Sequence, residues 1–410
     1  MSEADFKTIC ILGRQPALGL AELERLYGAE AVRPAGSSAL LALEPETVEF
    51  KRLGGVIKTG RVLAILPTTK WPDLLAYLRQ NIPNHLKQLP AGKFTLGVSF
   101  YGLSLPTAQL NKDVLGLKKI IQASGRPARI VPNKTLELNS AQVLHNKLTS
   151  RGGWELLLVK DGQRTILAQT LFVQDIEAYA ARDQARPARD ARVGMLPPKL
   201  AQIMVNLAVG PLEQKLVSEN KDNLSSARLR VRVLDPFCGT GVILQEALLA
   251  GYSALGTDIE PRMVQYSKTN IDWLVKENPQ IQGMAVIEQA DATRARWPGF
   301  SAIASEAYLG RPLATLPPPE KLGPIVNDVN TIISKFLRSL AGQIKPGRQI
   351  CLAVPAWRAP GGQLTNLPLL AKLTDMGYNI LDLKHVRHQD LIYFRENQVV
   401  ARQLLILEKR

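Results

Sequence analysis

Residues 231–241, Val-Arg-Val-Leu-Asp-Pro-Phe-Cys-Gly-Thr-Gly, decide the fold of the larger part of this chain. An apolar strand pattern ends at Asp235, a turn with Gly239 and Gly241 follows, and a helix pattern begins behind it. The two glycines let the backbone come close to a ligand at the carboxyl end of the strand, where doubly wound α/β sheets bind their ligands. The stretch therefore predicts a ligand-binding loop between a strand and a helix.

The same stretch excludes two phosphate-binding loops. A dinucleotide fingerprint needs a third glycine three residues after Gly241, where this chain has Leu244. A Walker-type loop needs a Gly-Lys-Ser/Thr sequence, which does not follow. What remains is a nucleoside-type cofactor without a phosphate chain, with the carboxylate of Asp235 near its cationic portion.

Acidic residues also end the next two predicted strands. Asp258 lies about 20 residues after the loop, where a carboxylate can take both hydroxyls of a ribose. Asp291 and Ala292 follow the third strand, where a carboxylate or a backbone amide can meet an adenine amino group. A single Asp after a strand is commonly a helix cap, but three in this order behind such a loop favour a nucleoside site.

The whole chain alternates strand and helix patterns. Over 200–410 the alternation predicts a parallel, doubly wound α/β sheet. Residues 1–90 show a β-α-β pattern and its repeat, which suggests a ferredoxin-like module, and 91–175 form a second α/β module. Residues 176–199 are a basic linker. Within these regions the pattern also predicts a hairpin over 154–171 and helices over 48–53 and 367–376.

The charge of the chain favours a polyanionic partner. Its 410 residues include 51 Lys and Arg against 36 Asp and Glu, a formal net charge of +15. Such an excess attracts phosphates over long range, although a merely basic surface is the alternative. For one group of linker arginines, contact with nucleic acid and a solvated connector are both open: Arg182, Arg186, Arg189 and Arg192.

Cysteine and histidine usage excludes a metal centre of the usual kinds. Cys10, Cys238 and Cys351 show no Cys-x-x-Cys spacing, so we expect neither a disulfide framework nor a cysteine zinc site, and no metal. No apolar run approaches the ~18 residues of a membrane span, and the first residues lack the order of a secretory signal. We therefore expect a cytoplasmic protein without a membrane partner.

These motifs resemble a known family. Residues 235–241, 257–259 and 291–292 are similar to the binding motifs of class I S-adenosylmethionine-dependent methyltransferases that modify exocyclic amines. More narrowly, Arg-Pro-Ala-Arg-Asp at 186–190 and Gly-Met-Leu-Pro-Pro-Lys-Leu-Ala at 194–201 resemble the segment before the catalytic domain in tRNA guanine-N(2) methyltransferases acting at position ten. Those proteins join a ferredoxin-like and a THUMP RNA-binding domain to a Rossmann-like methyltransferase domain with a mostly parallel, seven-stranded sheet.

The resemblance implies a cofactor and a substrate. S-adenosyl-L-methionine would lie across a set of loop and strand-end residues: Leu196, Pro197, Lys199, Asp235, Pro236, Phe237, Gly239, Gly241, Asp258, Ile259, Asp291 and Ala292. The expected partner is tRNA, of which the exocyclic amine of a guanine would be methylated. We expect no obligate protein partner and leave a small activating subunit open.

The catalytic loop departs from the family pattern. Members carry Asp or Asn, then Pro-Pro, then Tyr or Phe after the fourth strand, and the corresponding residues here are Ser305, Glu306, Ala307 and Tyr308. Because a guanine amine is a poor nucleophile, the enzyme must position hydrogen-bond acceptors and stack the extruded base. We therefore take Ser305, Glu306 and Tyr308 as catalytic candidates, with Glu306 supplying a carboxylate only if its side chain turns into the pocket.

Two other functions stay open on the sequence. A DNA amine methyltransferase would share the loop chemistry, but would carry a target-recognition domain in place of a THUMP-like one. A catalytically silent RNA-binding protein would keep the fold, and the altered loop at 305–308 is the feature in its favour.

Overall fold

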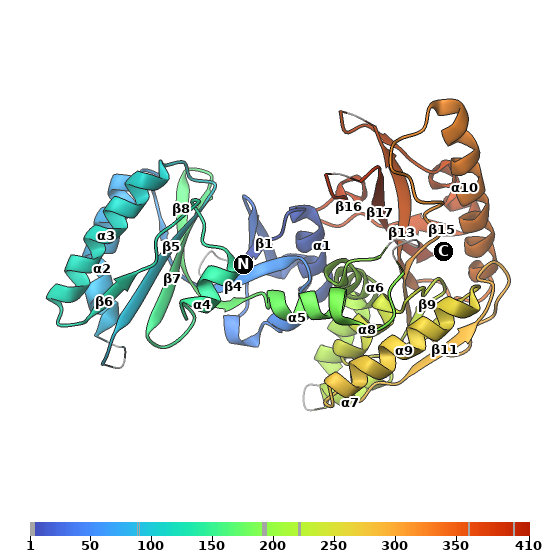
Figure 1. Ribbon diagram of the computed structural model, residues 1–410, viewed down its shortest axis with the longest axis horizontal. Coiled ribbons are helices and arrows are strands. Elements are labelled where there is room, and N and C mark those ends of the chain that lie inside the picture. Colours follow the sequence, from blue (N-terminus) through green and yellow to red (C-terminus); the bar gives the residue numbers. More distant parts are fainter. Residues whose placement is uncertain are drawn as a thin grey trace. The chain divides into compact units, whose positions relative to one another are not determined.

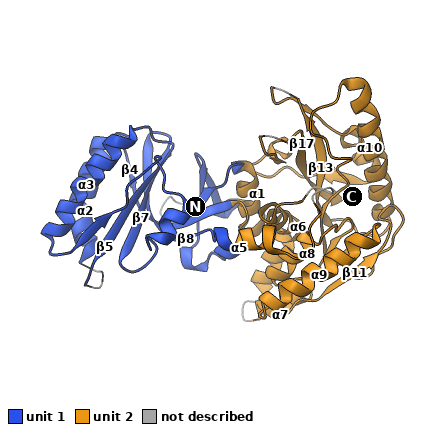
Figure 2. Ribbon diagram, viewed as in Figure 1, with its two compact units in different colours: residues 1–16, 30–51, 56–177 blue, residues 17–29, 52–55, 178–410 orange. Residues whose placement is uncertain are grey.

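The computed structural model divides the chain into two compact units. It describes residues 5–87, 89, 91–190, 195–219, 223–359, 361–396 and 398–410. The first unit comprises residues 1–16, 30–51 and 56–177, and the second comprises 17–29, 52–55 and 178–410 (Figure 2). Among the described residues, no helix has both the length and the apolar character that crossing a membrane requires.

The first unit is built on one eight-stranded sheet. Its strand order is β2-β3-β1-β4-β8-β7-β5-β6. The strands are β1 (Thr8–Leu12), β2 (Val32–Ala35), β3 (Ser38–Leu41), β4 (Val56–Leu66), β5 (Phe94–Tyr101), β6 (Ala128–Ile130), β7 (Gly153–Asp161) and β8 (Arg164–Val173). The helices α2 (Trp71–Leu86) and α3 (Thr107–Ala123) pack on its β5–β8 half, and α4 (Ser140–His145) is a short capped helix (Figure 1).

The sheet runs through both predicted N-terminal modules. The predicted hairpin over 154–171 is confirmed as β7 and β8. Strand β8 pairs along its other edge with β4, from Lys58 opposite Val173 to Leu66 opposite Thr165. The helix predicted over 48–53 is wrong, since this stretch holds only a 3₁₀ turn, Phe50–Arg52, before Gly54 and Gly55. A Cβ at Gly54 would collide with the carbonyl of Lys199, so the chain there is shaped by a close backbone approach.

A buried ion pair lies inside the first unit. The ammonium of Lys58 donates to the carbonyl of Leu138 at 2.6 Å and to the carboxylate of Glu155. Glu155 also accepts from Ser99 Oγ at 2.6 Å and Thr170 Oγ1 at 2.7 Å. Burial lowers the pKa of Lys58, and Glu155 opposes that effect. The pair is therefore compatible with burial because its hydrogen-bonding groups are satisfied.

The second unit contains a mixed, mostly parallel sheet. Its order is β11-β10-β9-β12-β13-β17-β15, parallel from β11 to β13, with β17 antiparallel to both of its neighbours in that order. The strands are β9 (Arg232–Asp235), β10 (Ser253–Asp258), β11 (Ala285–Gln289), β12 (Ala302–Glu306), β13 (Gln349–Arg358), β15 (Tyr378–Ile380) and β17 (Val400–Lys409), and the short β14 (Leu364–Thr365) and β16 (Ile392–Tyr393) pair with β13 and β17.

Helices cover both faces of this sheet, as the alternation predicts. The helices are α1 (Pro16–Tyr27), α6 (Pro198–Glu219), α7 (Leu224–Leu229), α8 (Val242–Leu249), α9 (Pro261–Glu277) and α10 (Pro319–Ala341), and α5 (Ile176–Ala180) lies at the boundary of the units. Figure 1 shows α10 on the face of the sheet opposite to α6 and α8. Successive strand residues point to opposite faces, so Val233 joins the core under α6 and α8 while Leu234 joins the core under α10. The predicted α/β class is confirmed, whereas 367–376 forms 3₁₀ turns in place of one helix.

Two N-terminal segments complete the second unit. Leu18 and Ala21 of α1 belong to the core that α6 and α8 build. Glu22 accepts from the backbone N–H groups of Gly54 and Gly55, at 2.9 and 2.8 Å, and from Asn206 Nδ2 at 2.7 Å. Burial raises the pKa of Glu22 to about 7, and these hydrogen bonds limit the rise. The contacts bind residues 17–29 and 52–55 to the second unit.

Removal of Glu155 tests the role of the buried pair in the first unit. Glu155→Ala leaves the Lys58 ammonium buried without its counter-charge, so we expect the free energy of unfolding to fall by about 3–5 kcal/mol. The control is Arg61→Ala, which breaks pairs with the exposed Glu44 and Glu46 and should cost less than about 1 kcal/mol. Urea unfolding, monitored by amide hydrogen exchange in β7 and β8, measures the loss of stability in both variants. Equal losses in the two variants would contradict this account.

Candidate active site

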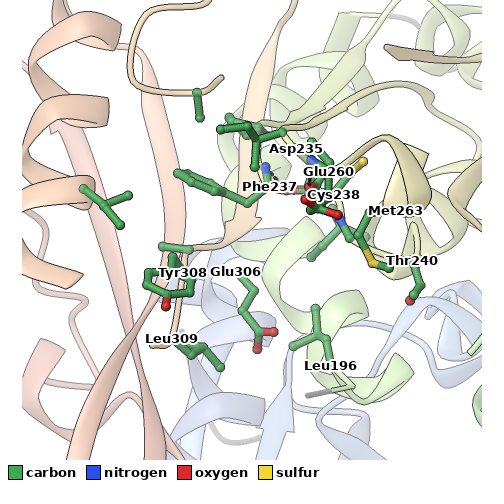
Figure 3. A pocket seen from close by; sticks show the side chains of 18 of the residues that line it. Leu196, Asp235, Phe237, Cys238, Thr240, Glu260, Met263, Glu306, Tyr308 and Leu309 are labelled. Atoms are coloured by element: carbon green, nitrogen blue, oxygen red, sulfur yellow. Dashed lines mark hydrogen bonds between the residues drawn. The ribbon is translucent and has the colours of Figure 1, made fainter. Parts of the chain in front are cut away.

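A cavity of about 670 Å³ lies where strands β9, β10, β11 and β12 end. This volume is typical of a small-molecule site, and the place is the one at which parallel α/β sheets bind ligands. The loops after all four strands contribute to its wall, together with Leu196 and part of α10 (Figure 3). The cavity therefore brings the predicted cofactor loop and the predicted catalytic loop together.

The loop after β9 is held by a buried carboxylate and by its glycines. Asp235 Oδ1 accepts from the backbone N–H of Phe237 at 3.2 Å and from Ser305 Oγ at 2.5 Å. Gly239 and Gly241 have φ values of +50° and +83°, which favour glycine. A Cβ on Gly241 would collide with Ser267, whereas a Cβ on Gly239 would meet none of the described atoms within 4 Å. The backbone at Gly239 is thus open to a ligand, and Gly241 packs against α9.

The ends of β10 and β11 place carboxylates along the same wall. Asp258 accepts from the backbone N–H groups of Gly239 at 2.9 Å and Glu260 at 3.0 Å, so it joins the two loops. Burial raises the pKa of Asp258, and these hydrogen bonds oppose it. Asp291 accepts from the side chain and backbone N–H of Thr293, which lowers its pKa. Ile259, the residue after Asp258, is 61% exposed and presents an apolar surface to the cavity.

The end of β12 sends two successive residues in opposite directions. Ser305 is fully buried, donates to Asp235 and does not line the cavity. Glu306 does line it, and Figure 3 shows its side chain extending between Tyr308 and Leu196. The Glu306 carboxylate accepts from Arg402 Nε of β17. Tyr308 lines the cavity with 39% of its surface exposed, which is available for stacking a ring.

The structure brings most of the predicted site residues together. Lining the cavity are Leu196, Asp235, Pro236, Phe237, Gly239, Asp258, Ile259, Asp291, Ala292, Glu306 and Tyr308. Pro197, Lys199, Gly241 and Ser305 lie outside its lining. Pro197 accepts the first hydrogen bonds of α6 with its carbonyl, and the Lys199 ammonium lies 5.0 Å from the centroid of the Tyr179 ring. Gly241 and Ser305 instead hold the loop after β9, through the contact with Ser267 and the hydrogen bond to Asp235.

The predicted RNA-binding arginines lie in different surroundings. Arg182 donates to the buried Glu246 at 2.7 Å and lies over the Tyr179 ring. Arg186 is buried, and none of its guanidinium nitrogens has a hydrogen-bond partner among the described residues. Arg189 is exposed, and Arg192 lies outside the described residues. Contact of these arginines with RNA stays a prediction. Arg189 is exposed and is therefore accessible to such a partner.

The structure adds lining residues that the sequence reasoning missed. Glu260 follows Asp258 by two positions, so its place near the predicted ribose site could have been noticed. Arg311 follows Gly310 just after the predicted catalytic loop, and Lys335 lies on α10. Both cations are exposed at the cavity. No motif singles out Lys335, because it is an ordinary polar position of an amphipathic helix.

Comparison with known proteins shows a distant relationship and a fold. No family model matches the chain. It is 34% identical over 150 residues to the tRNA (guanine(10)-N2)-dimethyltransferase of Methanothermobacter thermautotrophicus, an alignment that covers 34% of this chain and 38% of the relative. It is 35% identical over 120 residues to the protein of the same name from Pyrococcus abyssi, covering 28% and 29%. The matched segment thus spans about a third of the relatives' length.

Two solved structures match nearly the full length of the chain. TrmN from Thermus thermophilus superimposes with a TM-score of 0.50 at 17% identity, covering 99% of both chains. A possible methylase from Clostridium difficile 630 does so with a TM-score of 0.50 at 11% identity, covering 98% and 97%. At these identities the likeness shows the fold.

Asp235 gives the stability of the protein a dependence on pH. Burial raises its pKa from 3.8 to about 7, with the Asp258 and Glu306 carboxylates adding to the rise. Between these values the folded protein keeps a proton that the unfolded chain loses, so the free energy of unfolding decreases as the pH rises from about 4 to about 7. We therefore expect the free energy of unfolding of the wild type to fall between pH 5 and pH 8 by about 2–3 kcal/mol more than that of Asp235→Asn. Urea unfolding at the two pH values measures both changes.

The matched control for this variant is Asp375→Asn, which changes an exposed carboxyl group. Its unfolding should follow the pH dependence of the wild type. If Asp235→Asn followed it too, Asp235 would not carry the proton.

Proposed function

We propose that this chain is an S-adenosylmethionine-dependent methyltransferase that modifies the exocyclic amine of a guanine in tRNA. The observation that carries the proposal is that the glycine loop after β9 and residues 306–308 at the end of β12 line one cavity. The partial relatives named as tRNA guanine-N2 dimethyltransferases support the reaction, and the full-length fold of TrmN supports the architecture. The first unit would then hold the THUMP-like module predicted over 91–175 and most of the ferredoxin-like module predicted over 1–90, of which residues 17–29 and 52–55 belong to the second unit.

The lining of the cavity fits the proposed cofactor. Asp258 and Glu260 offer carboxylates to ribose hydroxyls, Ile259 offers an apolar face to adenine, and Asp291 offers an acceptor to its amino group. The open backbone at Gly239 leaves room for the methionine portion, with Asp235 close by. A wall of carboxylates suits a cationic ligand rich in hydroxyls and disfavours a phosphate chain. When bound, S-adenosylmethionine supplies an electrophilic methyl group on a positively charged sulfur.

Glu306 and Tyr308 would prepare the target amine. The lone pair of a guanine amine is delocalised into the ring, so the amine must be oriented to become nucleophilic. Glu306 accepts a hydrogen bond from the amine and can hold the proton that the amine gives up. Tyr308 stacks on the extruded base, and the exposed cations Arg311 and Lys335 suit the phosphates beside it.

A basic surface of the first unit suits the backbone of tRNA. Residues 87–153 contain ten Lys and Arg against two acidic residues, Asp113 and Glu137. Thr95 of β5 pairs with Gly153 of β7, so the exposed Lys93 and Arg151 lie side by side just before these parallel strands. Phosphate contacts of this kind place a structured RNA by its shape.

Two site variants test the proposed reaction in complementary ways. Glu306→Ala removes the proposed acceptor and should lower methyl transfer to tRNA by at least about 100-fold while leaving S-adenosylmethionine affinity within about twofold. Asp258→Ala should instead lower the affinity for S-adenosylmethionine, by about tenfold or more. Calorimetric titration and single-turnover transfer of a labelled methyl group measure the two effects. Full activity of Glu306→Ala would refute its role, and unchanged cofactor affinity of Asp258→Ala would refute the ribose assignment.

Charge removal tests the RNA surface independently of catalysis. The double variant Lys93→Gln, Arg151→Gln should weaken tRNA binding and reduce the slope of log K against log salt by about 2, because two phosphate contacts are lost. The control pair is Lys70→Gln, Lys160→Gln, which removes two exposed charges, one after β4 and one near the carboxyl end of β7, at the opposite end of the sheet. Filter binding over a salt series measures both slopes. Identical slopes would show that tRNA does not bind at Lys93 and Arg151.

A further inference from the structure

We infer that Arg402 and Glu306 form a base-reading pair, in which Arg402 holds the Glu306 carboxylate as an acceptor-only group that takes both N1–H and N2–H of guanine. The inference rests on the proposed function and goes beyond it. It assigns Arg402 a positioning role and names the feature of the base that the site selects. Three features of the structure support this role: the hydrogen bond between the two side chains, the burial of both, and their register in the sheet.

The sheet register brings the two residues together. Glu306 lies opposite Ala353 of β13, and Ala353 lies opposite Leu404 of β17. Arg402 is two residues from Leu404 along β17, so it points to the same face of the sheet as Glu306. Arg402 itself lies opposite Pro355 of β13, and its Nε donates to Glu306 Oε1 across that strand. The pair thus bridges β12 and β17 over β13.

Only one member of the pair faces the cavity. The side chains of Arg402 and Glu306 are 6% and 14% exposed, and Glu306 lines the cavity while Arg402 does not. Among the described residues, no hydrogen bond uses the second carboxylate oxygen, Oε2. Arg402 therefore contacts Glu306 without lining the cavity. Glu306 still offers Oε2 and a lone pair of Oε1 to a ligand.

Arg402 also sets the charge of the carboxylate. Burial raises the pKa of Glu306, and the Arg402 guanidinium opposes that rise through its charge and its hydrogen bond. The carboxyl group of Asp235 on β9 repels an ionised Glu306 only when Asp235 is itself ionised, and burial with the nearby Asp258 and Glu306 charges raises its pKa to about 7. The positive charge of Arg402 opposes the rise in the pKa of Glu306 and so favours the ionised form of Glu306, which accepts hydrogen bonds without donating.

An acceptor-only group distinguishes guanine from adenine. The Watson–Crick edge of guanine presents two adjacent donors, N1–H and N2–H, which match the two oxygens of a carboxylate. The edge of adenine presents a donor beside the N1 lone pair, which a carboxylate repels. A side-chain amide would offer one donor and one acceptor, and would fit adenine instead. The ion pair thus distinguishes guanine from adenine by the N1–H group. The N2 amine, which is methylated, is the second group that the carboxylate binds.

The test uses tRNA with 2-aminopurine at the nucleotide that the wild type methylates. 2-Aminopurine keeps the exocyclic amine but has an unprotonated N1. We expect the wild type to lose at least about 100-fold in kcat/KM on 2-aminopurine relative to guanine, since a hydrogen-bonding site rejects an analogue that lacks the donor. In Glu306→Gln we expect the ratio to shrink to about tenfold or less, because the amide nitrogen can donate to N1.

Variants of Arg402 test its positioning role. Arg402→Met should reduce the guanine preference, and Arg402→Lys should restore much of it because it keeps the charge. The control is Arg228→Met, which removes another buried guanidinium from a carboxylate, Glu213, away from the cavity. Its guanine to 2-aminopurine ratio should match that of the wild type. If Arg402→Met does not fold, Glu306→Gln still decides whether the carboxylate reads N1–H.

The outcomes separate this inference from the proposed function. Equal methylation of guanine and 2-aminopurine by the wild type would overturn the reading of N1–H and leave the proposed reaction standing. A full guanine preference in both Glu306→Gln and Arg402→Met would also overturn it. Absence of any methyl transfer to guanine by the wild type would overturn the proposed function, and the inference with it.

Discussion

The hydrogen bond from Ser305 to Asp235 fixes the arrangement on which the rest of the site depends. It joins the ends of β12 and β9, and both side chains are buried. Since successive strand residues point in opposite directions, the inward position of Ser305 sends Glu306 toward the cavity. Asp235 in turn holds the start of the glycine loop through Phe237. One buried contact thus fixes the proposed cofactor loop and the Glu306 carboxylate of the proposed catalytic loop relative to each other.

The carboxyl groups around the cavity are stabilised in different ways. Asp235 has a pKa raised to about 7, so it can stay protonated when nothing cationic is near. Asp258 is held by two backbone N–H groups, and Glu306 by the guanidinium of Arg402. These arrangements give a wall that accepts hydrogen bonds along its length while limiting repulsion within it. Such a wall suits a cationic nucleoside cofactor and the donor edge of guanine.

The sequence predicts the parts of the site that local patterns encode. The strand, turn and helix around Asp235 and the acidic ends of β10 and β11 lie where expected, because parallel strands align their carboxyl ends. Arg402 could not be predicted, because it is 96 residues from Glu306 and only the strand order brings it near. The inward position of Ser305 depends on strand register in the same way. The packing of α1 on the second unit follows from tertiary contacts of Glu22, which no periodicity reveals.

The most direct measurement is nucleoside mapping after incubation of the full chain with tRNA and S-adenosylmethionine carrying a labelled methyl group. The account predicts label in N2-methylated guanosine at a defined nucleotide. Label in another nucleoside, or tRNA binding without any transfer under single-turnover conditions, would contradict it.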